Sequence, residues 1–406
     1  MKALFLTNEY PPYTYGGAGV HVEYLTRELS RLMDVEVRSF GGDAGGNEHL
    51  TARGFPARED DFKTAPKSLQ GVFATLDRCL SFAGIGIDAQ VVHCHTWYTH
   101  MAGIWARLNY HIPLVLTTHS LEPLRPWKRE QLGHGYDFSS WVEKTAIEMA
   151  DAIVAVSKDT KSDILKYFSV DPEKIKIIHN GIDTDEFHKK TESDCIGRFG
   201  FDPDKPYLLF VGRITRQKGI IHLVNALPKV DAGLQIVLCA GAPDTPEIAA
   251  EMKEDIERVS AIRPGITWIR EMVDRKTLIQ LYSHAALFCC PSIYEPFGII
   301  NLEAMACSVP VIGSAVGGIP EVVTDNETGL LVPLQQMKTT PFEPVDPSKF
   351  SDDLAAAINR LACNSGLRES MGKKGRERVE AHFSWRAIAE QTRDLYQSLL
   401  KEWDKK

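Results

Sequence analysis

The sequence predicts an α/β protein built from two doubly wound parallel sheets. Three observations support this. Short apolar segments of strand length alternate with segments of helical periodicity from Lys2 to His179, and the same alternation restarts at Tyr207. Between these halves, residues 184–206 are charged and carry glycine and proline, as linkers do. The 406 residues are enough for two or three domains.

Composition narrows the class of protein. The formal charge is −8, with acidic and basic residues interspersed, so no basic stripe is present for a nucleic-acid backbone. The apolar run after Lys2 is too short for a signal peptide, and no segment reaches the roughly 18 apolar residues that span a bilayer. The eight cysteines are scattered and are expected to be reduced core residues. We therefore expect a cytoplasmic enzyme with neither nucleic-acid nor membrane partners.

The first half opens with a strand at 2–7, which leads into the glycine-bearing loop 8–19. Apolar residues then recur at helical intervals to Leu32. The loop has Gly16 and Gly17 but lacks the third glycine of a dinucleotide fingerprint and the Gly-Lys-Ser/Thr of a P-loop. It is either an anion-facing loop or an ordinary turn.

Further alternation predicts strands and helices up to the end of the first half. The strands are expected at 35–40, 90–95, 114–118, 152–156 and 175–179, and the helices near 68–82, 101–110, 139–150 and 157–168. Ligands bind beyond the carboxyl ends of such strands. Glu9, His95 and His119 fall there.

The histidines of this half admit two interpretations. His93 and His95 share one face of a strand, and no acidic or thiol ligand is near them in sequence, which argues against a metal site. His119 follows an apolar strand directly and is either a ligand-contacting or a structural histidine. The basic and aromatic segment from Leu121 to Tyr136, expected as a loop, would suit a sugar chain or an anionic acceptor; the alternative is a solvated loop.

In the second half, a strand at 207–211 leads through Arg213 and Lys218 into a helix at 220–227. Two cations at a helix start suit a diphosphate that gains negative charge as a glycosidic bond breaks. The alternative is a solvated cap. Strands are also expected at 234–240, 265–270 and 285–290.

The last of these strands runs into the segment Pro291-Ser-Ile-Tyr-Glu-Pro-Phe-Gly-Ile-Ile-Asn-Leu-Glu303, read as a bend followed by a helix at 299–306. Free N–H groups at a helix start suit hydroxyls and anions, and Gly298 lets the backbone approach a ligand closely. Glu295 and Glu303 flank this bend, and solvated glutamates are the alternative interpretation.

Taken together, these stretches resemble bacterial glycogen synthases of glycosyltransferase family 4, and most closely the branch that includes maltose-1-phosphate synthases. The resemblance is carried by Glu9-Tyr-Pro-Pro, Tyr15-Gly-Gly-Ala-Gly-Val-His-Val, His95-Thr-Trp-Tyr, His119-Ser-Leu-Glu-Pro-Leu-Arg-Pro-Trp-Lys, Gly212-Arg-Ile-Thr-Arg-Gln-Lys-Gly and the Glu295-x7-Glu303 segment. His134 departs from the glycine that is frequent in this branch.

The resemblance implies a GT-B fold, in which two Rossmann-like domains face a central cleft. The first domain would span 1–185, completed by a C-terminal helix at 386–406, and the second would span 186–385. It also implies transfer of glucose, with retention and without metal or cofactor, from ADP-glucose or UDP-glucose to an α-1,4-glucan in glycogen synthesis. The alternative acceptor is glucose 1-phosphate.

Site residues follow from the same resemblance. The expected catalytic residues are Glu295, His119, Arg213 and Lys218. The expected donor-binding residues are Gly16, Gly17, Asn180, Arg213, Lys218, Phe297, Gly298, Ile299 and Glu303. The expected acceptor-binding residues are Glu9, Tyr15, His95, Trp97, Arg125 and Lys128.

Three other classes stay open at this stage. A phosphorylase shares the architecture, but nothing in the chain resembles a Schiff-base lysine motif. A sugar-nucleotide epimerase would use two such domains without an acceptor. A non-catalytic glucan-binding protein would not need a diphosphate cradle. A homo-oligomer is compatible with the sequence.

Overall fold

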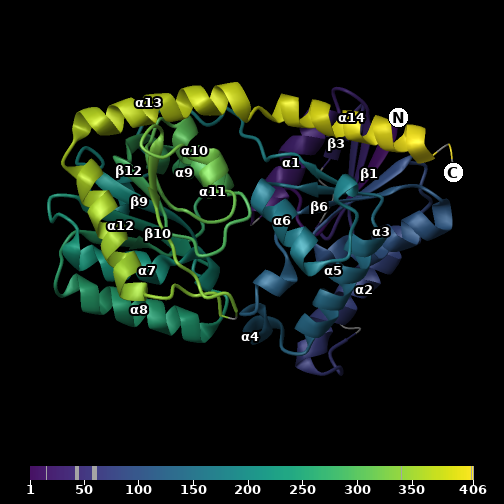
Figure 1. The fold of residues 1–406 in the computed structure, drawn as a ribbon, viewed down its shortest axis with the longest axis horizontal. Helices are drawn as coiled ribbons and strands as arrows, with labels where there is room; N and C mark the ends of the chain where they lie inside the picture. The colour runs from purple at the N-terminus through teal and green to yellow at the C-terminus, as the bar shows by residue number, and fades with distance from the viewer. Residues whose placement is uncertain (15, 42–44, 57–61, 340, 404, 406) are drawn as a thin grey trace. The chain divides into compact units, whose positions relative to one another are not determined.

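The computed structural model describes residues 1–14, 16–41, 45–56, 62–339, 341–403 and 405. The chain forms two compact units: unit 1 comprises Met1–Gly181 with Trp385–Lys406, and unit 2 comprises Ile182–Ser384. The divisions lie a few residues from the predicted boundaries after 185 and before 386. The C-terminal helix α14 (Trp385–Trp403) belongs to unit 1, where it packs along α1 (Gly17–Leu29) (Figure 1).

Unit 1 is built on a sheet whose order, in the described residues, is β3-β4-β2-β1-β5-β6-β7-β8. All neighbouring strands are parallel except β3 and β4. The strands are β1 (Lys2–Thr7), β2 (Asp34–Ser39), β3 (Gly45–Asn47), β4 (Leu50–Gly54), β5 (Val91–His95), β6 (Leu114–Thr118), β7 (Ala152–Ala155) and β8 (Ile175–Ile177).

Helices cover both faces of this sheet, because successive strand residues point to opposite sides. Along β1, Ala3 and Phe5 pack with α1 and α14, whereas Leu4 and Leu6 pack with the helices of the other face. That face carries α2 (Lys67–Ala83), α3 (Trp97–Tyr110), α5 (Gly135–Met149) and α6 (Lys158–Tyr167). Shorter turns are η1 (Glu122–Leu124), α4 (Lys128–Leu132) and η2 (Pro172–Lys174).

Two local expectations for this unit need correction. The segment 121–136 is not an open loop, because η1, α4 and the start of α5 occupy it. The helix expected near residue 101 begins at Trp97. The helix predicted near 157–168 is confirmed as α6, and the Ser157 side chain caps it by accepting a hydrogen bond from the Thr160 N–H.

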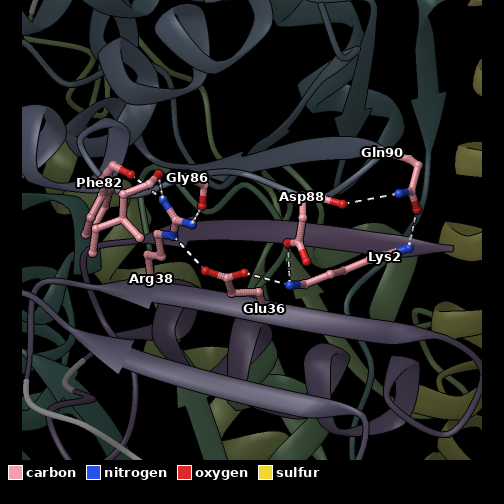
Figure 2. A network of polar contacts seen from close by, with 8 residues as sticks. Lys2, Glu36, Arg38, Phe82, Gly86, Asp88 and Gln90 are labelled. Atoms are coloured by element: carbon pink, nitrogen blue, oxygen red, sulfur yellow. Dashed lines mark hydrogen bonds and ion pairs between the residues drawn. The ribbon is translucent and has the colours of Figure 1, made fainter. Parts of the chain in front are cut away.

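A buried arginine ties the sheet of unit 1 to the end of α2 (Figure 2). Arg38 has no exposed surface; it donates to Glu36 at 2.8 Å, to the Gly86 carbonyl at 2.8 Å and to the carbonyl of Phe82. Lys2 completes the network by pairing with Glu36 at 2.9 Å. The guanidinium thus satisfies carbonyls that the end of a helix leaves without partners.

Unit 2 contains a parallel sheet with the order β11-β10-β9-β12-β13-β14 in the described residues. Its strands are β9 (Tyr207–Arg213), β10 (Gln235–Gly241), β11 (Ile266–Ile269), β12 (Leu287–Cys290), β13 (Val311–Ser314) and β14 (Gly329–Val332). Because β9 lies between β10 and β12, the segments that follow these three strands emerge side by side.

The helices of unit 2 also cover both sheet faces. One face packs against α7 (Ile220–Ala226), α8 (Pro246–Ser260), α12 (Pro347–Ala362) and α13 (Ser365–His382). On the other face lie α9 (Arg275–His284) and α10 (Ile299–Ala306). The remaining short elements are η3 (Gly197–Phe199), η4 (Arg216–Lys218), η5 (Leu227–Lys229) and α11 (Ile319–Val322).

Two further expectations concern the whole chain. Most cysteines are buried and all are free, but Cys363 is exposed and Cys195 is partly exposed, so these two are not core residues. Among the described residues, none of the helices combines the length and the apolar character needed to cross a membrane.

Candidate active site

The two predicted cations of unit 2 lie where β9 ends. Arg213 is the last residue of β9, and its Nη1 donates to the Asp244 carboxylate at 2.9 Å. Asp244 follows the neighbouring strand β10, and its side chain is only 7% exposed. A buried carboxylate therefore orients a guanidinium that remains partly open to solvent. Asp244 was not predicted, because this pair depends on the sheet order.

Lys218 and Glu295 are ion-paired in unit 2. The Lys218 Nζ lies 2.7 Å from Glu295 Oε2, and the Ser292 hydroxyl donates to the same oxygen at 3.2 Å. The side chains are 20% and 8% exposed, respectively. The predicted diphosphate-binding lysine and the predicted catalytic carboxylate are thus in direct contact. They can meet because β9 and β12, which precede them in the chain, are neighbouring parallel strands.

The Glu295 loop is held by a close backbone approach. A side chain at Gly317 would place its Cβ 2.0 Å from the Glu295 carbonyl oxygen, and Gly317 has a φ of +56°. The neighbouring Gly318 N–H donates to that carbonyl at 2.9 Å. Only glycine fits here, on grounds of both space and conformation.

Helix α10 begins directly after this loop, as predicted. Its first residue is Ile299, preceded by Gly298 with a φ of +90°, a conformation that few side chains tolerate. The N–H groups at this end have no partner within the helix, so they can bind hydroxyls or anions. Asn301 in the first turn is fully buried, and neither polar atom of its amide has a partner in the described residues.

Glu303 is buried in α10 and receives a hydrogen bond from the Tyr282 hydroxyl at 2.9 Å. Burial raises the pKa of Glu303 to about 7, although the hydrogen bond from Tyr282 opposes this. The carboxyl group is therefore close to half-ionised at neutral pH. An ionised carboxylate at this position can accept two hydroxyl hydrogen bonds.

In unit 1, the predicted glycine loop is organised by Glu9. Its carboxylate is buried and accepts the Gly16 N–H at 2.7 Å. That amide, which we predicted to face a diphosphate, is thus bonded to Glu9, and the prediction for Gly17 at the start of α1 stays a prediction. Tyr15, predicted to contact the acceptor, lies outside the described residues.

Four histidines gather at the carboxyl ends of the strands in unit 1. His95 Nδ1 lies 3.0 Å from His119 Nε2, and His21 Nδ1 lies 2.6 Å from Asn180 Oδ1. His93 bonds to the Tyr396 hydroxyl of α14 at 2.6 Å. Burial lowers the pKa of His21 to about 4 and lowers those of the other three well below the usual value, so all four are neutral at pH 7.

This arrangement bears on the roles predicted for two of the histidines. His95 has no exposed surface, so in this structure it contacts His119 rather than a ligand. His119 is partly exposed, which leaves it able to contact a bound sugar. His21, His95 and His119 offer one nitrogen each within 4.8 Å of one another and could hold a metal ion. A zinc ion bound at about 2.0–2.1 Å would require a closer set.

Three of the predicted acceptor residues, Arg125, Lys128 and Trp97, are mostly buried. Arg125 is mostly buried, and its Nη1 donates to Ser120 Oγ at 2.9 Å. Lys128 is 8% exposed at the start of α4. Trp97 is also buried, and its ring stacks on Tyr98 at 4.3 Å between centroids, so it presents little surface to a glucan.

Comparison with known proteins matches both halves of the chain. Residues 15–186 match the family described as Glycosyltransferase Family 4, and residues 195–340 match Glycosyl transferases group 1. An alpha-maltose-1-phosphate synthase of Mycolicibacterium smegmatis is 44% identical over 406 residues, covering 98% of this chain and 100% of that protein. The chain belongs to glycosyltransferase family 4.

Solved structures agree with the fold of this glycosyltransferase. Sucrose-phosphate synthase from Thermosynechococcus elongatus superposes with a TM-score of 0.79 at 25% identity, over 99% of this chain and 100% of that one. Anabaena HepE in complex with UDP and glucose gives 0.74 at 20% identity, over 98% of this chain and 100% of that one. The predicted GT-B class, with a Rossmann-like sheet in each unit, is thereby confirmed.

Some residues of the candidate site in this glycosyltransferase were not predicted from the sequence. Most of them form hydrogen bonds with residues that were predicted. They are Asp244 for Arg213, Ser292 for Glu295, Tyr282 for Glu303 and His21 for Asn180. Ser292 lies in the quoted segment, and Asp244 follows a strand end, so both could have been considered. Tyr282 has no comparable signal, because it is one apolar-face residue of an ordinary amphipathic helix.

Proposed function

We propose that this glycosyltransferase moves glucose from a nucleoside diphosphate glucose, ADP-glucose in the first instance, to glucose 1-phosphate, giving maltose 1-phosphate. The observation that carries the proposal is the full-length similarity to alpha-maltose-1-phosphate synthase at 44% identity. This acceptor replaces the α-1,4-glucan as the leading interpretation. No metal or cofactor is assigned to the reaction.

In the proposed reaction, the bond between the anomeric carbon of glucose and the diphosphate oxygen breaks. A new bond forms from that carbon to an acceptor hydroxyl, whose proton passes to the departing diphosphate. The configuration at the anomeric carbon is retained. Arg213 and Lys218 supply fixed positive charge for the diphosphate, and such preorganised charge stabilises a transition state in which negative charge develops.

The remaining groups of unit 2 are assigned to the sugar and the ribose. The backbone N–H groups from Phe297 to Ile299, at the start of α10, suit sugar hydroxyls, and Glu303 suits the ribose hydroxyls. Glu295 is placed to steady the positive charge that builds on the glucose ring. Its contact with Lys218 pairs the carboxylate with a positive charge until a diphosphate competes for the lysine.

In unit 1, His119 and Asn180 are assigned to the donor sugar, and Arg125 with Lys128 to the acceptor. His119 acts as a neutral imidazole, because burial depresses its pKa. It can therefore donate or accept a hydrogen bond without adding charge to the site.

The deciding assay offers glucose 1-phosphate and a short α-1,4-glucan as acceptors, each with ADP-glucose and with UDP-glucose, and follows nucleotide release. We expect the highest kcat/KM for the pair of ADP-glucose and glucose 1-phosphate. Elongation of the glucan without use of glucose 1-phosphate would contradict the proposal and favour glycogen synthesis. Replacing Glu295 or Lys218 with alanine should reduce turnover by about 10²-fold or more; near-normal rates in both would refute their roles.

A further inference from the structure

Two buried glutamates are in contact in unit 1: Glu122 begins η1, shortly after β6, and Glu143 lies in α5. Glu122 and Glu143 are 2% and 4% exposed, and the Glu122 N–H donates to Glu143 Oε2 at 2.8 Å. Glu122 also accepts from the Ser139 hydroxyl at 2.7 Å through its carboxylate and from the Tyr136 hydroxyl at 2.6 Å through its carbonyl. Buried carboxylates are costly, so this arrangement calls for a role beyond packing.

The cluster of Glu122, Glu143 and Arg125 contains one ion pair, between Glu122 and Arg125. Burial, and then repulsion from Glu122, raises the pKa of Glu143 well above its usual value, whereas Arg125 acts in the opposite direction. Glu143 therefore holds a proton more readily than an exposed glutamate does, and the ion pair of the cluster joins Glu122 Oε1 to Arg125 Nη1 at 3.5 Å.

Within the described residues, the hydrogen bond and the ion pair of the Arg125 guanidinium both involve the same nitrogen. Nη1 donates to Ser120 Oγ at 2.9 Å and lies 3.5 Å from Glu122 Oε1. Nε is buried and has no hydrogen-bond partner in the part of the chain that the structure describes. Nε and Nη2 form the edge with which arginine binds phosphate through two parallel hydrogen bonds. A buried donor without a partner at this edge is a feature that a ligand would explain.

We propose that Arg125 binds the phosphate of the acceptor through its Nε and Nη2 edge, and that Glu122 and Glu143 are positioning residues that hold the guanidinium in this orientation. The inference rests on the proposed function, since it assigns the phosphate of a sugar-phosphate acceptor. Glu122 anchors the arginine directly. Glu143 acts through Glu122, by accepting its N–H and fixing η1.

Arg129, four residues further along the chain, provides a matched control. It pairs with Asp137 through both terminal nitrogens, at 2.5 and 3.1 Å, and these two side chains are 53% and 60% exposed. Such a surface pair contributes little to stability. Arg129→Gln should therefore behave like the wild type.

The test compares Arg125→Gln, Arg129→Gln, Glu143→Leu and Glu143→Gln in the full chain. For each variant, kcat and the two KM values are measured with ADP-glucose and glucose 1-phosphate. Inorganic phosphate is titrated as a separate inhibitor. Arg125→Gln should raise the KM for glucose 1-phosphate about 10- to 100-fold and leave the KM for ADP-glucose within about twofold. Phosphate should inhibit the wild type and Arg129→Gln competitively with glucose 1-phosphate, and Arg125→Gln much less.

The Glu143 variants test positioning. Leucine cannot accept the Glu122 N–H and should raise the KM for glucose 1-phosphate, whereas glutamine keeps an acceptor oxygen and should restore it. If Glu143→Leu does not fold, Arg125→Gln decides alone. A wild type that ignores glucose 1-phosphate would overturn the proposed function and this inference together. A wild type that uses it, with equal KM values in Arg125→Gln and Arg129→Gln, would overturn the inference only.

Discussion

Glu303 gives the sharpest prediction, because its pKa of about 7 places its titration within the working pH range. If the ionised carboxylate accepts the ribose hydroxyls, nucleotide binding must first remove its proton at lower pH. Below its pKa, each pH unit should then weaken ADP binding by up to about tenfold, which corresponds to about 1.36 kcal/mol. Above pH 8, affinity should no longer depend on this group.

The assay is calorimetric titration of ADP between pH 5.5 and 8.5, for the wild type and for Glu303→Gln. The nucleotide phosphates also titrate in this range, but they do so equally with both proteins. The difference between the two curves therefore isolates Glu303. Exposed Glu369 on α13 serves as the control through Glu369→Gln, which should reproduce the wild-type curve. Parallel curves for wild type and Glu303→Gln would refute the assignment of Glu303 to the ribose.

Stability offers an independent check of the same pKa. Since folding raises the pKa of Glu303 from 4.5 to about 7, the folded chain binds more protons than the unfolded chain between these values. The associated stability is fully present below pH 4.5 and is lost as pH rises towards 7, by about 3 kcal/mol at 1.36 kcal/mol per unit. Without nucleotide, the denaturation midpoint of Glu303→Gln should fall less over this window than that of the wild type.

Three further predictions follow from contacts outside α10. Arg38→Met should lower the free energy of unfolding of unit 1 by about 3–5 kcal/mol, because it leaves buried carbonyls unpaired and leaves the buried Glu36 carboxylate with Lys2 alone; a loss under 1 kcal/mol in urea denaturation would contradict this. Gly317→Ala should reduce kcat by about 10²-fold, since its Cβ would displace the Glu295 backbone; unchanged steady-state kinetics would show that the loop tolerates the shift. Asp244→Asn should raise the KM for the donor about tenfold by loosening Arg213, with the acceptor KM unchanged as the internal control.

Periodicity was sufficient to predict most of the architecture. Apolar strands of four to seven residues between helical segments indicated both sheets, and the predicted helix at 299–306 has the bounds observed for α10. The prediction of a loop at 121–136 was wrong. Glycines and charged residues are frequent in this segment, so it shows no helical periodicity, although η1, α4 and the first turn of α5 lie there. These turns are stabilised by hydrogen bonds from α5 to the carbonyl and the carboxylate of Glu122, and residue propensities do not predict such tertiary contacts.

The contacts between side chains that are distant in sequence could not be predicted from the sequence. Lys218 and Glu295 are 77 residues apart, and His93 and Tyr396 are 303 apart. Their contacts depend on which strands are neighbours and on where the last helix packs. The buried state of His95 follows from the same packing, which is why a residue predicted to touch the acceptor contacts His119 instead.

The most direct test of the central claim is to identify the product formed from ADP-glucose and glucose 1-phosphate by proton NMR during the first turnovers. Our account predicts one ADP per disaccharide phosphate, with the new anomeric signal in the α configuration from the start. A β-configured product, or free glucose released with ADP and no disaccharide, would contradict it.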